Sequence, residues 1–402
     1  EQANGAALVF YGDTVVLVTA TASDKPRDGI DFFPLSIDYE ERLYSVGKIP
    51  GGFIKREGRP SEKAILTSRC IDRPLRPLFP KDYRNDVAIV ATVMSVDQDC
   101  SPEIAAMIGS SIALIISDIP FVDTMSSVSI GYCDGELVVN PTAAQREISR
   151  LNLTVSSTKD KVMMIEAGAD EIPDDLMLDA IKLAHKVNGE VIDFINEIHE
   201  KEGKPLQEYT EHVIPEDVYK LISEYITDEA MEVAVYKELK QERDQAIREI
   251  TEKVNEELTD AIAVLVDEDT DIPALIDETI YKFEKMTVRR MILREHKRPD
   301  GRGLEEIRPL AAEVDILPRT HGSALFTRGQ TQALTVTTLG AMSEIQRLDG
   351  LDTSEVSKRY IHHYNMPGYS TGEAKTSRGP GRREIGHGAL AEKALLPVIP
   401  SE

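Results

Sequence analysis

Short hydrophobic runs alternate with longer helical patterns over the first 200 or so residues. Runs of Val, Ile, Leu and Thr at 15–21 and 86–93 predict buried strands, because β-branched residues fit a pleated, half-buried surface. Further strands are predicted at 128–132, 136–139, 151–156 and 162–166. Apolar residues at helical spacing predict helices over 102–116 and 173–198. The mixture predicts an α+β domain.

In the next segment, apolar residues recur at helical spacing and acidic residues become frequent. Apolar residues from Val218 to Val254 recur at helical spacing, and Pro215 followed by Glu216 and Asp217 marks a helix start. We therefore predict an all-helical domain. Its acidic residues fit a solvated helical face, and a second hypothesis is that they repel a polyanionic ligand by like charge.

A repeated pattern links the two ends of the chain. Residues 5–21 (GAALVFYGDTVVLVTAT) and 322–338 (GSALFTRGQTQALTVTT) match at an offset of 317 positions. Three shorter matches follow in the same order: 44–47 with 369–372, 56–57 with 383–384, and 62–66 with 392–396. Ordered matches of this kind predict a duplicated domain. The predicted domains are 1–204, 205–295 and 296–402, with the first copy starting inside the repeated unit and the second incomplete.

Composition narrows the class of protein. The chain has 46 Lys and Arg against 70 Asp and Glu, and its formal net charge of −24 argues against indiscriminate nucleic-acid binding. A hydrophobic content of 41% excludes a disordered or fibrous chain. The sequence has no run of 18 apolar residues, so it predicts no membrane span. Cys70, Cys100 and Cys133 lie far apart without a CxxC pair, which predicts a cytoplasmic protein without a disulfide frame or zinc site.

Positive charge is nevertheless concentrated in one predicted helix of the first copy. Arg69 and Arg73 are one helical turn apart, and Arg76 follows on the same side. Guanidinium groups on one face suit phosphate oxygens, which accept bidentate hydrogen bonds. The alternative is a salt-bridged helix in which Asp72 and Glu62 pair with these cations.

A glycine-bounded loop, 49–59, precedes this helix, which Ser61 is predicted to cap. Phe53 lies in the loop beside Lys55 and Arg56. An exposed ring on which a base stacks, flanked by cations that hold the backbone, is typical of single-strand binding. The alternative is that Phe53 packs into the core.

The second copy carries a glycine-rich basic loop that runs into a predicted helix, 377–388. A helix start offers free N–H groups and a positive dipole end to phosphate, and Arg382 and Arg383 lie there. His387, between two glycines, is poorly placed for core packing and is a candidate functional residue.

Two adjacent histidines, His362 and His363, precede Tyr364 and fit a strand. They have no carboxylate or cysteine partners at ligand spacing, so we do not expect them to bind a metal ion.

Several of these segments together resemble one family, the bacterial polynucleotide phosphorylases. The resemblance is carried by 33–35 (FPL), 49–78, 297–302 (KRPDGR) and 364–388, and it covers essentially the whole chain. It implies an α+β fold in which duplicated RNase PH-like cores (a ribosomal protein fold-like βαβα unit) are joined by an all-α domain.

The resemblance also implies an activity. Inorganic phosphate, as co-substrate, would attack the 3′-terminal phosphodiester of single-stranded RNA with Mg²⁺ assisting. Nucleoside diphosphates would be released, and the reverse reaction would polymerise them without a template. The family resemblance further implies mRNA turnover, a cytoplasmic homotrimeric ring, KH and OB-type domains beyond this chain, and contacts with other RNA-degradation proteins. The implied RNA-binding residues are Phe53, Lys55, Arg56, Arg69, Arg73, Arg76, Arg382, Arg383 and His387.

The family's catalytic groups are two aspartates, a lysine and a serine-rich phosphate loop, and we expect them beyond Glu402. The corresponding stretch of the first copy has Arg146, Asn152 and Thr154, which do not make a Mg²⁺–carboxylate site. We therefore name no catalytic or metal residue in the chain and expect the 402 residues alone to be inactive. Two alternatives are a non-catalytic RNA-binding scaffold and a hydrolytic exonuclease on the same fold.

Overall fold

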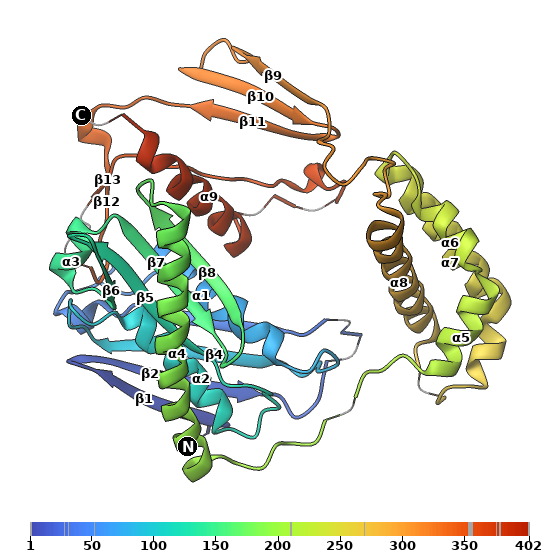
Figure 1. Cartoon of the computed structure of the whole chain (residues 1–402), viewed down its shortest axis with the longest axis horizontal. Coiled ribbons are helices and arrows are strands. Elements are labelled where there is room, and N and C mark those ends of the chain that lie inside the picture. The colour runs from blue at the N-terminus through green and yellow to red at the C-terminus, as the bar shows by residue number, and fades with distance from the viewer. Residues whose placement is uncertain are drawn as a thin grey trace. The chain divides into compact units, whose positions relative to one another are not determined.

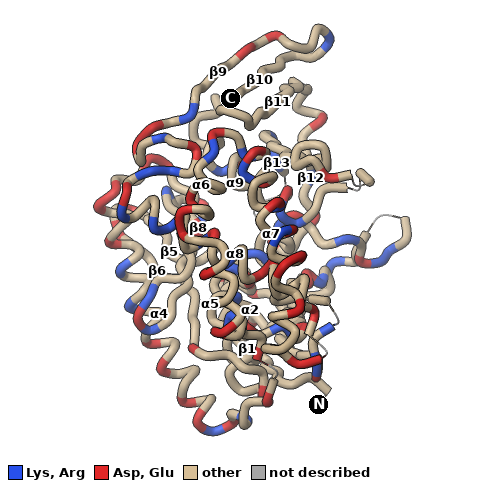
Figure 2. The backbone as a smooth tube through the Cα atoms, turned by 90° about the vertical axis from the view of Figure 1, so that its right-hand side faces the viewer, with Lys and Arg blue, Asp and Glu red and all other residues tan. Residues whose placement is uncertain are grey.

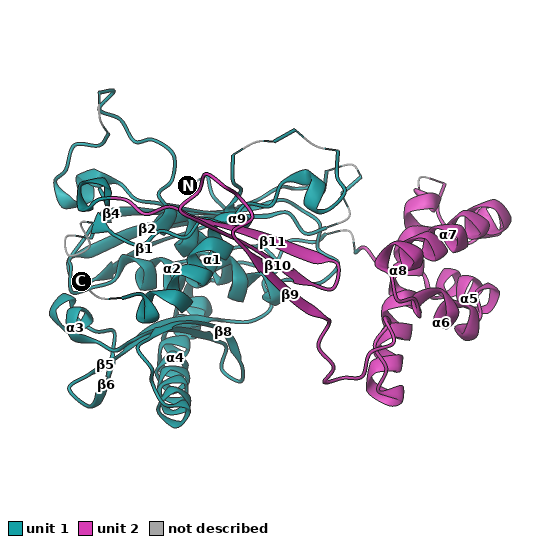
Figure 3. Cartoon of the chain, turned by 90° about the horizontal axis from the view of Figure 1, so that it is seen from above, with its two compact units in different colours: residues 1–211, 341–402 teal, residues 212–340 magenta. Residues whose placement is uncertain are grey.

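A computed structural model describes the chain except for residues 1, 28, 31, 52, 210, 269, 353–356, 375, 378 and 401–402. Gly52 of the first basic loop and Arg378 of the second therefore lie outside the described residues. The chain forms two compact units, Glu1–Glu211 with Ala341–Glu402, and His212–Gly340 (Figure 3). Among the described residues, no helix is both long and apolar enough to cross a membrane.

The first unit contains two four-stranded sheets. One has the order β1-β2-β4-β3 and the other β6-β5-β7-β8 (Figure 1). The bounds of the first sheet are β1 (Gly5–Tyr11), β2 (Thr14–Ala22), β3 (Leu35–Glu40) and β4 (Val87–Ser95). Those of the second are β5 (Ser126–Cys133), β6 (Glu136–Val139), β7 (Leu151–Ser157) and β8 (Val162–Ala169). Every strand predicted over this region is confirmed.

Helices cover these sheets in layers. Helices α1 (Glu62–Leu75) and α2 (Pro102–Ile115) contact both sheets, and their apolar faces share one core with the first sheet. Helix α4 (Asp174–Glu202) packs on β5 and β7, whereas α3 (Ala143–Ile148) is a single short turn that begins at a capping box. The arrangement confirms the predicted α+β fold and places α1 against β3.

The second unit begins with helices, as the acidic helical pattern predicts. They are α5 (Glu216–Tyr225), α6 (Asp228–Val235), α7 (Lys240–Ala263) and α8 (Ile272–Arg290), followed by a π-helical turn, Met291–Glu295. Their apolar faces form a separate core, while acidic positions recur along the helices (Figure 2). A three-stranded sheet follows, with β10 (Gly322–Arg328) between β9 (Leu310–Val314) and β11 (Thr331–Thr337).

The predicted duplication is confirmed by two local structures. The β1–β2 hairpin pairs Gly5 with Ala20, and the β10–β11 hairpin pairs Gly322 with Thr337, each residue 317 positions later. Both turns need a left-handed glycine, at Gly12 (φ 57°) and Gly329 (φ 58°). The 44–47 match is confirmed too. Residues 44–47 and residues 369–372 each form a 3₁₀ turn that ends at a glycine with positive φ.

The other two sequence matches are wrong in register. Helix α9 (Arg382–Leu395) has the length of α1, starts 320 positions later and likewise ends in a proline-containing 3₁₀ turn. Glu62 therefore opens α1, whereas its predicted counterpart Glu392 lies in the last turn of α9. Arg383 likewise lies in the first turn of α9, but Arg56 is in a loop. Glu, Lys, Ala and Leu suit any helical position, so a short match between them does not fix the alignment.

The predicted strand around His362 and His363 is also wrong. In the first copy, β3 lies at the edge of its sheet, and β4 is its one neighbouring strand among the described residues. No strand among the described residues pairs with 360–365, so this segment has no ladder to join. Instead, the His362 N–H donates to the Glu392 carboxylate at 2.9 Å. The segment is extended chain held against α9.

Candidate nucleic-acid interface

The predicted RNA-binding residues lie in three segments of the first unit. They come from the loop before α1, from α1 with its following 3₁₀ turn, and from the start of α9. The structure packs α1 against α9 (Figure 1), although these helices are about 320 residues apart in sequence. Basic residues of the two copies therefore come together on one pair of helices.

Phe53 projects from the loop as a fully exposed ring, and Ile54 beside it is also largely exposed. The loop turns back on itself at Gly51 (φ 71°), where a Cβ atom would come within 2.7 Å of the Arg56 carbonyl oxygen. Lys55 adopts a left-handed conformation (φ 54°) in the same turn. The exposure excludes a core role for Phe53 and leaves its ring free to stack on a base.

Helix α1 starts where the sequence predicts, with the Ser61 hydroxyl accepting a hydrogen bond from the Ala64 N–H at 2.9 Å. Arg73 Nη1 donates to Glu166 Oε2 at 2.8 Å. Arg69 is half-buried, and its guanidinium lies against Gly386 of α9, where a Cβ atom would come within 2.4 Å of Arg69 Nε. Arg69 has neither a hydrogen bond nor an ion pair with any described residue, so its donors remain available.

Arg76 is held differently from the other two arginines. It donates to both carboxylate oxygens of Asp72, at 2.7 and 3.0 Å, and to the carbonyl oxygens of Phe33 and Leu35, at 3.0 and 3.1 Å. The alternative of a salt-bridged helix therefore describes Arg76 and Asp72. Most of its donors are occupied, and the side chain ties the end of α1 to the segment before β3.

The start of α9 presents two consecutive arginines in different surroundings. Arg382 Nη1 donates to the Ile37 carbonyl oxygen at 2.5 Å, and its Nη2 donates to Asp38 Oδ1. Arg383 is exposed and has no hydrogen bond or ion pair with a described residue. One turn later, the exposed His387 ring stacks on Tyr364, with centroids 5.0 Å apart and planes 30° apart.

Glu166, on β8, links the two copies. Its carboxylate accepts from Arg73 of α1 and from Lys393 of α9, at 2.8 and 3.0 Å. Burial would raise the pKa of this carboxyl, but the charges and hydrogen bonds of Lys393 and Arg73 outweigh burial and lower it. Sequence reasoning missed Glu166, Lys393 and Asp38, because each is an isolated charge that acquires a partner only through tertiary packing.

Replacing Glu166 with Gln is expected to lower the free energy of unfolding by about 1 kcal/mol at pH 7, since two partly exposed cations lose their shared anion. The folded-state pKa is lowered, so this stabilisation is present above the ordinary value of 4.5 and is lost as the pH falls through the folded pKa. Urea unfolding at pH 7 and at pH 3 measures the loss of stability and its dependence on pH. Glu147→Gln, at an exposed position of α3, is the control and should change neither. An equal loss at both pH values would contradict the charge argument.

No group of three or more His, Cys, Asp or Glu in the described part of the chain is placed to hold a metal ion. In the first copy, Arg146 donates to the carbonyl oxygens of Pro141 and Gln98, at 2.9 and 2.7 Å, while Asn152 and Thr154 lie on β7. This donor set lacks the carboxylates that Mg²⁺ prefers, so it does not fit the ion. We derive no catalytic step through a metal.

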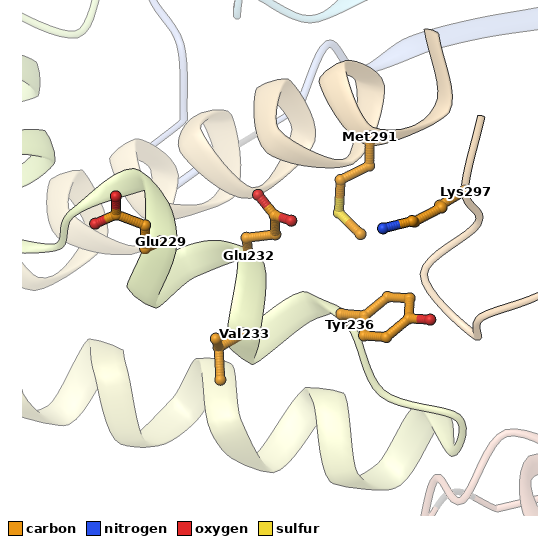
Figure 4. A pocket seen from close by; sticks show the side chains of 6 residues that line it. All are labelled: Glu229, Glu232, Val233, Tyr236, Met291 and Lys297. Carbon is orange, nitrogen blue, oxygen red and sulfur yellow. The ribbon is translucent and has the colours of Figure 1, made fainter. Parts of the chain in front are cut away.

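A hollow of about 280 Å³ in the helical unit is a weaker candidate (Figure 4). It is lined by Glu229, Glu232, Val233, Tyr236, Met291 and Lys297. Two of its three charged groups are carboxylates, which would repel a phosphodiester. We therefore place the candidate interface on α1, α9 and the loop.

Comparisons with known proteins agree with this layout. The family model described as "3' exoribonuclease family, domain 1" matches residues 1–120 and 306–402, and domain 2 of that family matches 123–187. A third model, "Polyribonucleotide nucleotidyltransferase, RNA binding domain", matches 214–303.

Two curated relatives carry the name "Polyribonucleotide nucleotidyltransferase". The one from Lachnoclostridium phytofermentans is 63% identical over 401 residues, and the one from Ruminiclostridium cellulolyticum is 60% identical over 400. Each match covers 100% of this chain and 56% of the relative, so the chain spans little more than half of their length. A solved structure of rice (Oryza sativa) Rrp46 is 14% identical, with a TM-score of 0.42. The match covers 50% of this chain and 90% of the rice chain.

Proposed function

The chain belongs to the 3′ exoribonuclease family, and from this premise we propose that the protein degrades single-stranded RNA from 3′ to 5′ by phosphorolysis. Inorganic phosphate attacks the terminal phosphodiester and a nucleoside diphosphate leaves; the reverse reaction extends RNA without a template. The observation that carries the proposal is the identity of 57–63% over the whole chain with curated enzymes named polyribonucleotide nucleotidyltransferase. Its role in the cell is mRNA turnover.

The nine residues predicted from the sequence form the proposed RNA interface. Phe53 supplies a stacking surface, and Lys55 and Arg56 beside it hold the backbone. On α1, Arg69 offers unpaired donors to phosphate oxygens. Arg76 contributes by fixing the end of α1, because its donors already bind Asp72 and two carbonyl groups. The remaining members are Arg73, Arg382, Arg383 and His387.

The wider organisation is part of the same proposal. The proposed domains are 1–204, 205–295 and 296–402. They are supported by the family matches, which cover 1–120 and 123–187, then 214–303, and finally 306–402. The protein is a cytoplasmic homotrimer that meets other RNA-degradation proteins. It uses inorganic phosphate as co-substrate, and carboxylates outside the described residues hold its Mg²⁺.

Product analysis tests the reaction class. The protein at its natural length, given poly(A), Mg²⁺ and inorganic phosphate, is expected to release ADP, and omission of phosphate is expected to abolish that release. Thin-layer chromatography separates the products. AMP release without phosphate would indicate hydrolysis instead, and RNA binding without any mononucleotide product would indicate a scaffold.

A further inference from the structure

A short segment of the second copy contacts the first copy next to the loop that carries Phe53. We propose that this segment, residues 350–352, positions the 49–59 loop for RNA, and that Lys48 is a positioning residue and not a phosphate contact. The inference rests on the proposed function, because it takes the loop as a binding surface for single-stranded RNA. It gives the second copy a role in the loop of the first.

Both sides of the loop are tied to one residue, Leu43. The Lys48 N–H donates to the Leu43 carbonyl oxygen at 2.9 Å, and the Leu43 N–H donates to Glu57 Oε1 at 3.0 Å. Leu43 is buried and belongs to the core that the first sheet shares with α1 and α2. The loop that projects the Phe53 ring therefore closes on a buried point of the first copy.

Residues 350–352 reach the base of the loop from the second copy. Lys48 Nζ donates to the Gly350 carbonyl oxygen at 3.0 Å, across 302 sequence positions. Leu351 is only 3% exposed and packs into the same core of the first copy. Its carbonyl oxygen accepts from Gln98 Nε2 at 3.1 Å. A side chain and two carbonyl groups of the second copy are thus held by the first.

The third residue of the segment, Asp352, extends the contact to α1. Its carboxylate lies 3.8 Å from Lys63 Nζ, which also pairs with Glu103 at 2.9 Å. Burial alone would lower the pKa of the Lys63 amine, but Glu103 and Asp352 raise it well above its ordinary value. Lys63 therefore stays protonated and holds one carboxylate from each copy.

Lys48 is the residue through which this contact bears on RNA. A lysine beside a basic loop would ordinarily be assigned to a phosphate, but its amine donates to a protein carbonyl group. Without that bond, the base of the loop is less constrained. RNA must then order the loop as well as stack on Phe53, and ordering a loop on binding costs affinity.

Hydrogen exchange tests the support directly, in the protein at its natural length and without RNA. Leu351→Ala is expected to raise the exchange rate of the backbone amides of residues 43–48 about tenfold, and Lys48→Met about threefold, because the lost contacts limit local opening. Leu153→Ala is the matched control, since it removes the same groups from a fully buried position in β7. It should lower resistance to urea but leave the exchange of residues 43–48 unchanged.

RNA binding separates positioning from contact. Fluorescently labelled oligo(A) is titrated by anisotropy at several salt concentrations. Lys48→Met is expected to weaken binding about threefold with an unchanged salt slope, because loop order is lost and a phosphate contact is not. Lys48→Arg, which keeps a donor of similar reach, should bind as the wild type does. Lys55→Met, in the loop itself, is expected to lower the slope by about 0.7, the value for one phosphate contact on a single strand.

The outcomes separate the inference from the proposed function. A salt slope lowered equally by Lys48→Met and Lys55→Met would make Lys48 a phosphate contact and overturn its positioning role. Unchanged exchange in Leu351→Ala, or equal acceleration in Leu153→Ala, would overturn the support by residues 350–352. Failure of the wild-type protein to bind oligo(A) would instead count against the proposed function and the RNA role of the loop, while hydrogen exchange would still decide the support.

Discussion

Replacing Ile89 with Ala is expected to lower the free energy of unfolding by about 3 kcal/mol, the usual cost of deleting buried methyl and methylene groups and leaving a cavity. Ile89 is 0% exposed and lies in β4, between Ala20 of β2 and Ile37 of β3. Ile89 belongs to the core that the first sheet shares with α1 and α2, so the substitution leaves a cavity within that core. The surrounding sheet is hydrogen-bonded on both sides and cannot collapse into the space.

Urea unfolding followed by circular dichroism measures the effect. Ile148→Ala is the matched control, because Ile148 is 56% exposed in α3 and should change the free energy of unfolding by no more than about 0.5 kcal/mol. A similar loss in both variants would show that helix and strand propensity dominates over burial. A small loss at Ile89 would show that the core of the first sheet repacks.

Replacing Phe53 with Ala is expected to weaken single-stranded RNA binding by about tenfold or more, since base–aromatic stacking contributes about 1–3 kcal/mol per base. The ring is fully exposed, so its removal takes nothing from the core and should leave the free energy of unfolding unchanged. The separation of the two effects distinguishes a binding residue from a structural one.

Anisotropy with labelled oligo(A) and urea unfolding measure the two quantities on the same preparations. Phe10→Ala is the control, because Phe10 is a 67% exposed ring on β1, outside the proposed interface. It should leave RNA affinity unchanged. Equal weakening by both variants would point to non-specific hydrophobic contact, and no weakening at Phe53 would remove the loop from the interface.

Local features of the site could be predicted because each depends on near neighbours in the sequence. Glycines on both sides predicted the loop around Phe53, but whether its ring was exposed or packed into the core was left open until the structure showed it exposed. Ser61 caps α1 because a hydroxyl before a helical run accepts the N–H three residues on. The one-turn spacing of Arg69 and Arg73 is likewise a property of the helix.

Contacts between distant segments could not be predicted in this way. Arg76, Arg382 and Arg383 look alike in the sequence, yet the first two are bound to protein acceptors and the third is not. The strand expected at His362 failed for a related reason, since a strand needs a partner whose position only the sheet supplies.

The sequence by itself determined the elements, the internal repeat and the family, because hydrophobic periodicity, turn glycines and motifs are written along the chain. The tertiary structure alone decided the register of α9 against α1 and which cations remain unpaired. The physical reason is that an ion pair forms between atoms brought within a few ångströms, and residues such as Arg382 and Asp38 are over 300 positions apart until the chain folds.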